Sequence, residues 1–141
     1  MSTELELKNK EVTHRLWDII QGGNLDELDQ VLGENVLLQV PGEAEMRGIE
    51  AYRDYIKLYN QAFPDVTIEV TDMIQEDDKV VTHFMWRGTH MGEMAGIGAT
   101  GKTAKAPGVT INRFRDGKVI EDINYWDNLA FMEQLGVVKS P

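Results

Sequence analysis

The chain has 141 residues, 42% of them hydrophobic, and 24 acidic against 14 basic side chains give it a formal charge of −10. This length suits one hydrophobic core, so we expect a single domain over residues 1–141. The acidic balance argues against nucleic acid and anionic membranes as partners, because phosphate binding needs a basic surface. Without cysteine there is no thiol nucleophile and no disulfide framework. A charged N-terminus and the absence of a long apolar run favour a cytoplasmic protein without a membrane span.

Two helices are expected before the first strand. Ser2 or Thr3 caps the first, which should stop at Gly22-Gly23. Its apolar stripe, at nearly helical spacing, consists of Leu5, Val12, Leu16, Ile19 and Ile20. Asn24 then caps a short helix over residues 24–32, which Gly33 ends. We expect a strand over residues 35–40, followed by an exposed acidic turn.

The rest of the chain predicts one long helix, four strands and a short final helix. The long helix covers residues 48–63 and ends at Phe63-Pro64-Asp65. The predicted strands, bounded by turn residues, cover residues 66–74, 79–87, 109–114 and 119–126. The final helix covers about 128–135. Helices followed by consecutive strands indicate an α+β domain with a curved antiparallel sheet.

Between the second and third of these strands, residues 88–103 read GTHMGEMAGIGATGKT, whose five glycines predict a long, shaped loop. Four of its residues match the phosphate-loop pattern G-x-x-x-x-G-K-[ST]: Gly96, Gly101, Lys102 and Thr103. A phosphate loop needs a helix directly after it, whose N-terminus faces the phosphates. Pro107 and Gly108 leave no room for such a helix, so the match does not favour a nucleotide site.

The same loop and its flanks carry a family resemblance. The longest segments are GTHMGEMAGIGATGK, the preceding DDKVVTHFMWR and the following GVTINRFRDGKVIEDINYW. Shorter matches are Ala62-Phe63-Pro64-Asp65, Asp116-Gly117-Lys118 and Gln134-Leu135-Gly136. Together they resemble the signature of SnoaL-like proteins, a family that includes polyketide cyclases and ester cyclases. The usual loop pattern is GTHxGExxGIxPTGK, and this chain has Ala99 where proline is common.

The resemblance implies the cone-shaped α+β barrel of the nuclear transport factor two superfamily. In that fold a curved antiparallel sheet and N-terminal helices enclose one pocket, which would hold a small hydrophobic molecule. Such folds commonly pair through the outer face of the sheet, which implies a homodimer. The three histidines of the chain, at positions 14, 83 and 90, match no metal-ligand spacing.

In SnoaL-like polyketide cyclases, an aspartate on the last strand acts as acid/base in an intramolecular aldol condensation, helped by a histidine on the preceding strand. Aligning the family pattern with this chain puts Asn124 in place of the aspartate and Thr110 in place of the histidine. Asparagine can donate a hydrogen bond to an enolate oxygen, but it does not abstract a proton near neutral pH. The resemblance therefore implies a cyclase site whose usual proton-transfer pair is absent.

The register of the last hairpin decides which side chains accompany Asn124. A three-residue turn with a bulge at Asp116-Gly117 would place the following on one face of the sheet: Thr110, Asn112, Ile120, Asp122 and Asn124. A two-residue turn would instead place Asn124 with Ile111 and Arg113. Both registers remain open at this point.

Three carboxylates near the end of the chain are alternative bases: Asp127, Asp122 and Glu121. An apolar pocket raises the pKa of a carboxyl group and suits it to proton abstraction next to a carbonyl. The plainer interpretation is that Glu121 and Asp122 are solvated strand residues and that Asp127 caps the last helix.

Further candidates are polar or aromatic. His83 and Arg113 are candidates for polarising a substrate oxygen together with Asn124, whereas His90 is expected to hold the loop through side-chain to backbone hydrogen bonds. The candidates for lining a ligand cavity are Trp17, Tyr55, Tyr59, Trp86, Met94 and Trp126. Most aromatic and methionine residues at such spacings are simply core.

Two functions follow as hypotheses. The first is an enzyme that acts on a small hydrophobic carbonyl compound by acid/base chemistry, without metal or organic cofactor, with Asp127 or Asp122 as the base. The second is a non-catalytic small-molecule-binding protein that keeps the fold and pocket but has lost the acid/base pair.

Overall fold

The computed structural model describes residues 2–138 and confirms the α+β class. The helical elements are α1 (Glu4–Gly22), a 3-10 helix (Leu25–Gln30), α2 (Ile49–Ala62) and α3 (Asn128–Gln134). The strands are β1 (Leu32–Gln39), β2 (Met46–Arg47), β3 (Thr67–Glu76), β4 (Lys79–Thr89), β5 (Thr103–Arg115) and β6 (Lys118–Trp126). Within the described residues, no helix combines the length and apolar character needed to cross a membrane.

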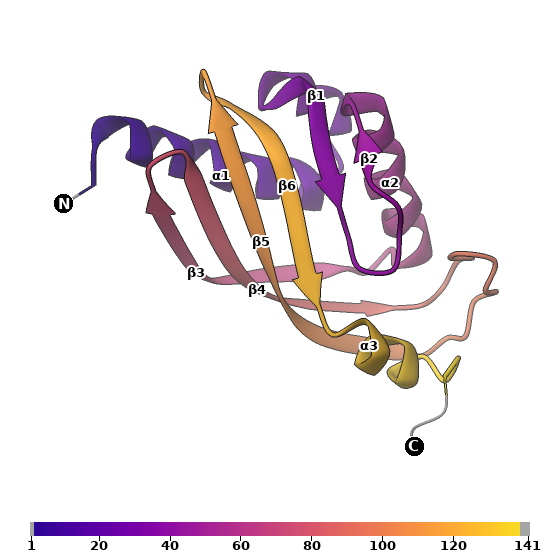
Figure 1. Cartoon of the computed structure of the whole chain (residues 1–141). Coiled ribbons are helices and arrows are strands. Elements are labelled where there is room, and N and C mark those ends of the chain that lie inside the picture. Colours follow the sequence, from indigo (N-terminus) through magenta and orange to yellow (C-terminus); the bar gives the residue numbers. More distant parts are fainter. Residues whose placement is uncertain (1, 139–141) are drawn as a thin grey trace.

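All six strands form one sheet, in the order β2-β1-β6-β5-β4-β3. Its pairs are antiparallel except that of β1 with β6, which is parallel. Figure 1 shows that the long strands β3, β4 and β5 bend strongly, that α1 and α2 lie on the same side of the sheet, and that α3 follows the end of β6. The sheet does not close into a barrel. Its curvature gives it one concave side, which holds the core and a cavity.

The first helix begins and ends where the sequence indicates. Thr3 Oγ1 accepts a hydrogen bond from the Glu6 N–H at 3.1 Å, and Glu6 Oε1 accepts one from the Thr3 N–H at 2.7 Å. Gly23, with φ of 74°, caps the other end in the left-handed region. The predicted stripe is wrong at Leu5, which is 59% exposed in the first turn, whereas Leu16 and its neighbours toward the C-terminus are buried.

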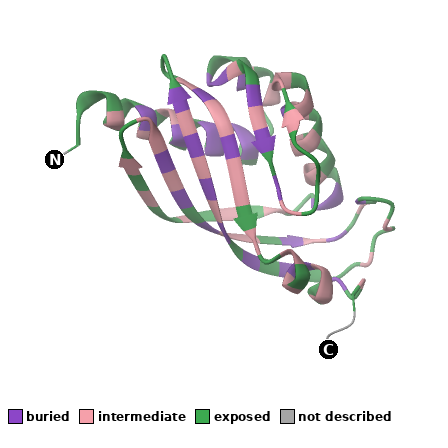
Figure 2. Cartoon of the chain, in the orientation of Figure 1, coloured by how far each residue is buried: buried purple, intermediate pink, exposed green. Residues whose placement is uncertain are grey.

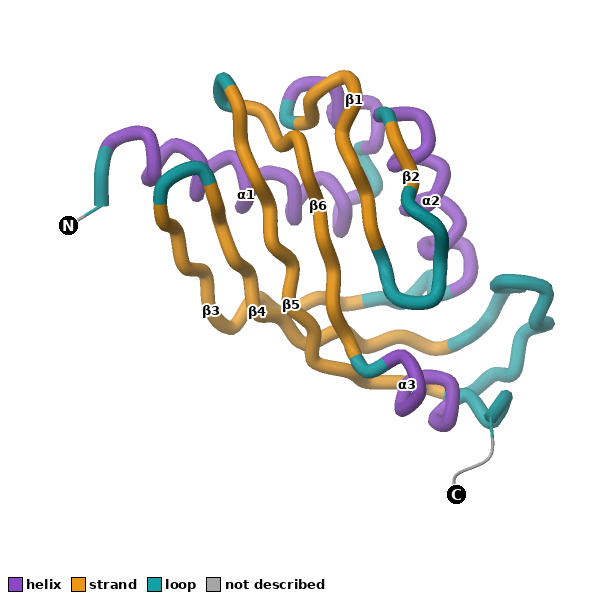
Figure 3. Tube along the Cα trace, viewed as in Figure 1, coloured by secondary structure: helices purple, strands orange, loops and turns teal. Residues whose placement is uncertain are grey.

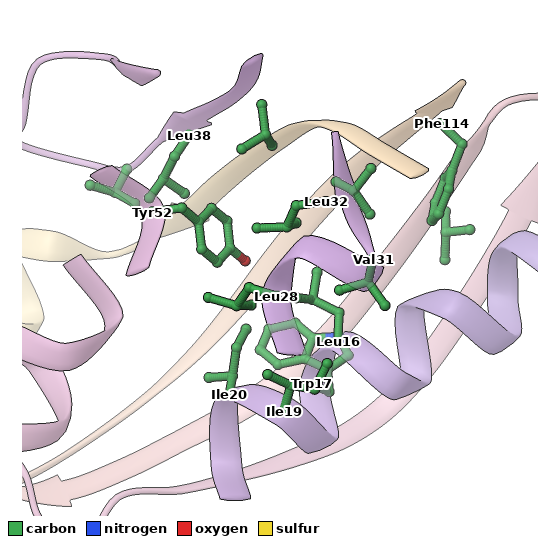
Figure 4. Packing of buried hydrophobic residues seen from close by; sticks show 14 of the residues in the cluster. Leu16, Trp17, Ile19, Ile20, Leu28, Val31, Leu32, Leu38, Tyr52 and Phe114 are labelled. Atoms are coloured by element: carbon green, nitrogen blue, oxygen red, sulfur yellow. The ribbon is translucent and has the colours of Figure 1, made fainter. Parts of the chain in front are cut away.

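The predicted helix over residues 24–32 is only a 3-10 helix, and the Asn24 side chain makes no cap hydrogen bond. Leu32 belongs to β1, where it pairs with Val119, so Gly33 lies inside a strand rather than after a helix. Leu28 and Val31 are three residues apart, and both are almost fully buried. They belong to one core cluster with side chains of α1 and with Tyr52 of α2 (Figure 4). A 3-10 helix has about three residues per turn, so residues three apart lie on the same side of it and can both be buried.

The strand predicted to begin at residue 109 begins at Thr103, and its pairing with β4 continues through Pro107 and Gly108. A Cβ atom on Gly108 would lie 2.4 Å from Cζ of Phe84, so this glycine allows a ring to pack against the strand rather than making a turn. The loop between β4 and β5 is correspondingly shorter than expected (Figure 3). Strand β2 begins at Met46, the last residue of the acidic segment 42–46 predicted to be an exposed turn.

Burial alternates along the central strands, as a sheet covered on one face requires. Along β5 every second residue from Ala104 to Phe114 is buried, and β4 alternates in the same way over residues 80–84 (Figure 2). The buried side faces α1 and α2, with Trp17 of α1 packed against Phe84 at a ring separation of 5.2 Å. This parity determines which polar residues of β5 and β6 enter the interior.

Candidate active site

The β5–β6 hairpin has the two-residue turn of one predicted register and the shared inner face of the other. Arg115 pairs with Lys118 around a two-residue turn, in which Asp116 and Gly117 have φ values of 52° and 78°. Positive φ at both central residues is the geometry that Asp-Gly favours in tight hairpins. The register then shifts by one residue, so that Thr110 nevertheless pairs with Asn124 and Asn112 with Asp122.

This shift is a bulge at Ile120, between Val119, which pairs with Phe114, and Glu121, which pairs with Arg113. Because side chains alternate along a strand, one extra residue exchanges the inward and outward positions beyond it. Asp122 is therefore on the inner face, where its side chain is 4% exposed. Glu121 is on the outer face, with its Oε2 3.8 Å from Arg113 Nε. The bulge decides which of two adjacent carboxylates enters the interior.

Three side chains donate hydrogen bonds to the Asp122 carboxylate. Its Oδ2 accepts from the Tyr52 hydroxyl at 2.8 Å and from Asn112 Nδ2 at 3.1 Å. Its Oδ1 accepts from Asn124 Nδ2 at 2.7 Å. Oδ1 is therefore the carboxylate oxygen with more unused acceptor capacity.

Burial raises the pKa of Asp122 above its ordinary value, although the hydrogen bonds from Tyr52, Asn124 and Asn112 act in the opposite direction. Burial also raises the pKa of Tyr52, and the negative charge of Asp122 adds to that effect. A carboxyl group of this kind binds a proton more readily than a solvated one. The solvated-strand interpretation is therefore wrong for Asp122.

The two residues that the resemblance aligns with the usual acid/base pair are hydrogen-bonded to each other. Thr110 Oγ1 donates to Asn124 Oδ1 at 2.6 Å, and Asn124 Nδ2 contacts the Gln39 carbonyl oxygen at 3.2 Å as well as Asp122. Neither side chain titrates, and the Asn124 amide is already engaged on both sides. In this arrangement Asn124 orients the carboxylate.

An apolar cavity of about 120 Å³ lies above this polar cluster, between α1, α2 and the concave side of the sheet. Its walls include the predicted candidates Trp17, Tyr55, Tyr59, Trp86 and Trp126, and its polar residues include Asn112, Asp122 and Asn124. Asp122 contributes the single carboxylate among the described residues that line it. The structure thus brings all five predicted aromatic candidates to one cavity that contains one carboxylate.

Other candidates lie elsewhere. His83 is exposed on the outer face of β4, where its Nδ1 lies 2.9 Å from Thr71 Oγ1, and Arg113 shares that outer face. Asp127 caps α3, since its Oδ1 accepts from the Ala130 N–H at 2.9 Å. Met94 is buried in a separate cluster with Phe131 and its neighbours, and it does not line the cavity. These four positions do not support the site roles first considered for them.

The glycine-rich loop makes contacts with itself and with the end of α2. His90 is fully buried, and its Nδ1 accepts a hydrogen bond from the Thr100 N–H at 3.3 Å, as expected for a residue that holds the loop. The N–H groups of Met91 and Gly92 both donate to the Ala62 carbonyl oxygen. Thr103 begins a strand rather than a helix, so the phosphate-loop pattern lacks its structural context. In the described chain, His, Cys, Asp and Glu side chains form no group of three suited to a metal ion.

Sequence reasoning missed the site roles of Tyr52 and Asn112. Tyr52 stands three and seven residues before Tyr55 and Tyr59, a spacing that puts all three on one helix face. Asn112 has the same strand parity as Thr110. These spacings could have pointed to Tyr52 and Asn112. Their contact with Asp122 depends on the register of the β5–β6 hairpin, which the sequence left open.

Comparisons with known proteins agree with this geometry. The family model described as SnoaL-like polyketide cyclase matches residues 10–135. A candidate SnoaL-like polyketide cyclase from Jannaschia sp. CCS1 has a TM-score of 0.91 and 25% identity, over 100% of this chain and 99% of that chain. IdmH, a candidate polyketide cyclase from Streptomyces antibioticus, has a TM-score of 0.77 and 27% identity, over 92% of this chain and 99% of that chain. No curated protein matched by sequence. The cone-shaped fold expected from the resemblance is confirmed.

Proposed function

The chain belongs to the SnoaL-like polyketide cyclase family, and from this premise we propose that it is a cofactor-independent acid/base enzyme. Its substrate would be a small hydrophobic carbonyl compound, and its reaction would begin with removal of a proton from the carbon next to the carbonyl. The observation that carries the proposal is Asp122, a buried carboxylate at the boundary between a hydrogen-bonded cluster and an apolar cavity.

The chemistry follows from the geometry of this carboxylate. Asp122 Oδ1 takes the proton, so a C–H bond breaks, an O–H bond forms, and the electron pair moves onto the carbonyl oxygen as an enolate. In an aldol step the enolate carbon attacks a second carbonyl, and Asp122 returns its proton to the new alkoxide. Asn124, Asn112 and Tyr52 hold the carboxylate for both transfers. Burial raises its pKa, which makes it a stronger base than a solvated carboxylate.

Exchange of carbon-bound hydrogen for deuterium tests the proton-abstraction step without knowledge of the final product. Single-ring aryl ketones and 1,3-diketones would be incubated with the protein in D2O and followed by proton NMR. We expect the wild type to accelerate exchange at the carbon next to the carbonyl, and Asp122→Asn to reduce that acceleration on the order of 100-fold or more. An unchanged rate in the variant would overturn the role of Asp122.

A second candidate function is binding without catalysis. It is favoured by the Thr110–Asn124 hydrogen bond, which joins two non-titrating side chains at the positions where the family resemblance expects proton-transfer groups. A protein of this kind would bind the same ketones with micromolar affinity and leave their exchange rates at the solvent value. Parallel calorimetry and exchange measurements on each ketone separate the two functions.

We also propose that two copies pair through the outer face of the sheet. Val81, Ile111 and Ile123 lie in register across three strands on that face, and the nearby Tyr125 is 59% exposed. Burying this row would remove apolar surface from water. Sedimentation at micromolar concentration should show a dimer, and Tyr125→Lys should weaken it. A wild-type species of only 16.0 kDa would contradict the pairing.

A further inference from the structure

We propose that the Tyr55–Tyr59 hydroxyl pair of α2 is a second polar group in the cavity, and that it holds the carbonyl oxygen of a ligand about the size of one substituted ring. The inference rests on the proposed function, because the carbonyl it assigns to these tyrosines is the one whose neighbouring carbon Asp122 deprotonates. It assigns the oxygen-binding role that His83 and Arg113, on the outer face, do not fill.

The position of the pair follows from helix periodicity. Tyr52, Tyr55 and Tyr59 stand at i, i+3 and i+7, so all three side chains leave α2 on one face, and all three line the cavity. The hydroxyl of Tyr52 is committed to Asp122. Tyr55 and Tyr59 also line the cavity, and both are half-buried.

Tyr55 and Tyr59 lie next to each other on the wall of the cavity. Their ring centroids are 4.7 Å apart, and each side chain shifts the pKa of the other. When one hydroxyl of such a pair donates to the other, the accepting hydroxyl is polarised and becomes a stronger donor. In the proposed site Tyr55 donates to Tyr59, and Tyr59 donates to the ligand oxygen.

The charge state of the pair fits this role. Burial raises the pKa of Tyr55, and the neighbouring Tyr59 and the negative charges of Glu43 and Asp122 add to that shift. Burial also raises the pKa of Tyr59. Both tyrosines therefore keep their protons over the physiological pH range. When Asp122 breaks the C–H bond and forms its O–H bond, Tyr59 stabilises the enolate oxygen by a hydrogen bond without transferring its proton.

The dimensions of the cavity limit the ligand. A cavity of about 120 Å³ is close to the roughly 150 Å³ engineered cavity that binds benzene, whereas pockets for drug-sized ligands occupy about 300 Å³ or more. The walls carry flat rings, including Trp86, Trp126 and Phe131. Aromatic walls around this volume suit one planar ring that bears a carbonyl group. A ligand with three fused rings would require several buried side chains to move.

A pair of isosteric probes tests the oxygen contact. Acetophenone and α-methylstyrene have nearly the same shape, but the hydrocarbon carries a methylene group in place of the carbonyl oxygen. We expect the wild type to bind acetophenone at least tenfold more tightly by calorimetry, and Tyr59→Phe to bind the two about equally. Tyr125→Phe, which alters an exposed tyrosine on the outer face, is the matched control and should keep the wild-type preference.

A second series of probes tests the size limit on the wild type alone, so the inference does not depend on a variant folding. Affinity should fall at least tenfold from acetophenone to 9-acetylanthracene. Equal affinity for the three-ring ketone, or a ketone preference that persists in Tyr59→Phe, would overturn the inference. If the preference depends on Tyr59 but no deuterium exchange occurs, the catalytic proposal fails and the binding site stands. If exchange depends on Asp122 but not on Tyr59, only the tyrosine assignment fails.

Discussion

Two regions of the molecule can be compared: the loop between β4 and β5, and the inner face of the β5–β6 hairpin. The sequence pattern is conspicuous in the first and inconspicuous in the second. The loop contains the most conspicuous pattern of the chain, yet its polar groups bond to one another and to α2, as His90 does with Thr100. The hairpin face carries unremarkable residues, yet it places Asp122 beneath an apolar cavity. The glycine-rich pattern of the loop therefore reflects close packing. The candidate site depends instead on which residues of β5 and β6 face the interior.

The same difference appears in what each region requires from its residues. A Cβ atom on Gly92 of the loop would lie 2.6 Å from the Gln61 carbonyl oxygen, so glycine there permits backbone contact with α2. In the hairpin the essential feature is the bulge at Ile120, which directs Asp122 inward. The loop should therefore respond to changes in backbone space, and the hairpin to changes in hydrogen bonding and charge.

The largest effect on stability should come from Asp122→Ala. This change leaves the buried Tyr52 hydroxyl without its acceptor and removes one hydrogen bond each from Asn112 and Asn124, so we expect the free energy of unfolding to fall by about 3 kcal/mol. Glu121→Ala, next along the strand, removes only an exposed ion pair and should cost about 0.5 kcal/mol or less. Urea denaturation measures both, and equal losses would contradict the distinction between the two faces.

A smaller effect is expected from Gly92→Ala in the loop. The added methyl group meets backbone atoms of Gln61 and Ala62, which cannot move aside as a flexible side chain would. We expect a loss of about 2 kcal/mol in the free energy of unfolding. Gly98→Ala is the matched control, because a Cβ there meets nothing within 4 Å, and its thermal midpoint should stay near that of the wild type. Similar midpoints for the two variants would show that the loop does not pack as described.

The pH dependence of stability should identify Asp122 by its sign. Its folded-state pKa is raised above the unfolded value of about 3.9, so the folded chain binds more protons than the unfolded chain between these two values. The contribution of this side chain to the free energy of unfolding therefore falls as pH rises from about 4, and it levels off above the folded-state pKa.

Asp122→Asn lacks this titration. The stability of the variant relative to the wild type should increase over the same pH interval, as measured by urea denaturation at each pH. Groups such as Asp65, whose pKa is lowered by hydrogen bonds from Thr89, are common to both proteins and cancel in the difference. A difference that is flat or decreases with pH would contradict a raised pKa at Asp122.

The smallest expected effect concerns the phosphate-loop pattern. Because Thr103 begins β5 and no helix follows Lys102, millimolar ATP with Mg²⁺ should leave the thermal midpoint within about 1 °C of its value without nucleotide. Lys102→Ala provides the control for non-specific ionic effects. A rise of several degrees that disappears in this variant would place phosphate chemistry in the loop.

Much of the fold is readable from local sequence signals. The capping box at Thr3, the stop at Gly23 and the periodicity of α2 each depend on neighbouring residues, and each lies where the sequence indicates. Local signals misled where tertiary packing prevailed, as at Gly108, which accommodates the Phe84 ring inside a strand rather than ending a loop.

The site was less accessible to sequence reasoning. The sequence left two registers open, and only one of them puts Asn124 on the same face as Thr110, where the structure has it. The bulge at Ile120 has no local signature, and it decides between Glu121 and Asp122. His83 and Arg113 were plausible as residue types, and strand parity places both on the outer face. The hydrogen bond from Tyr52 to Asp122 joins residues 70 positions apart, so only the folded chain reveals it.

The most direct test of the account is a crystal structure of the protein with a bound single-ring ketone. We predict the ketone in the cavity, with the carbon next to its carbonyl within about 3.5 Å of Asp122 Oδ1, the separation that a near-attack geometry requires. A ketone held in the cavity without contact to this carboxylate would contradict acid/base catalysis by Asp122 and favour a binding protein.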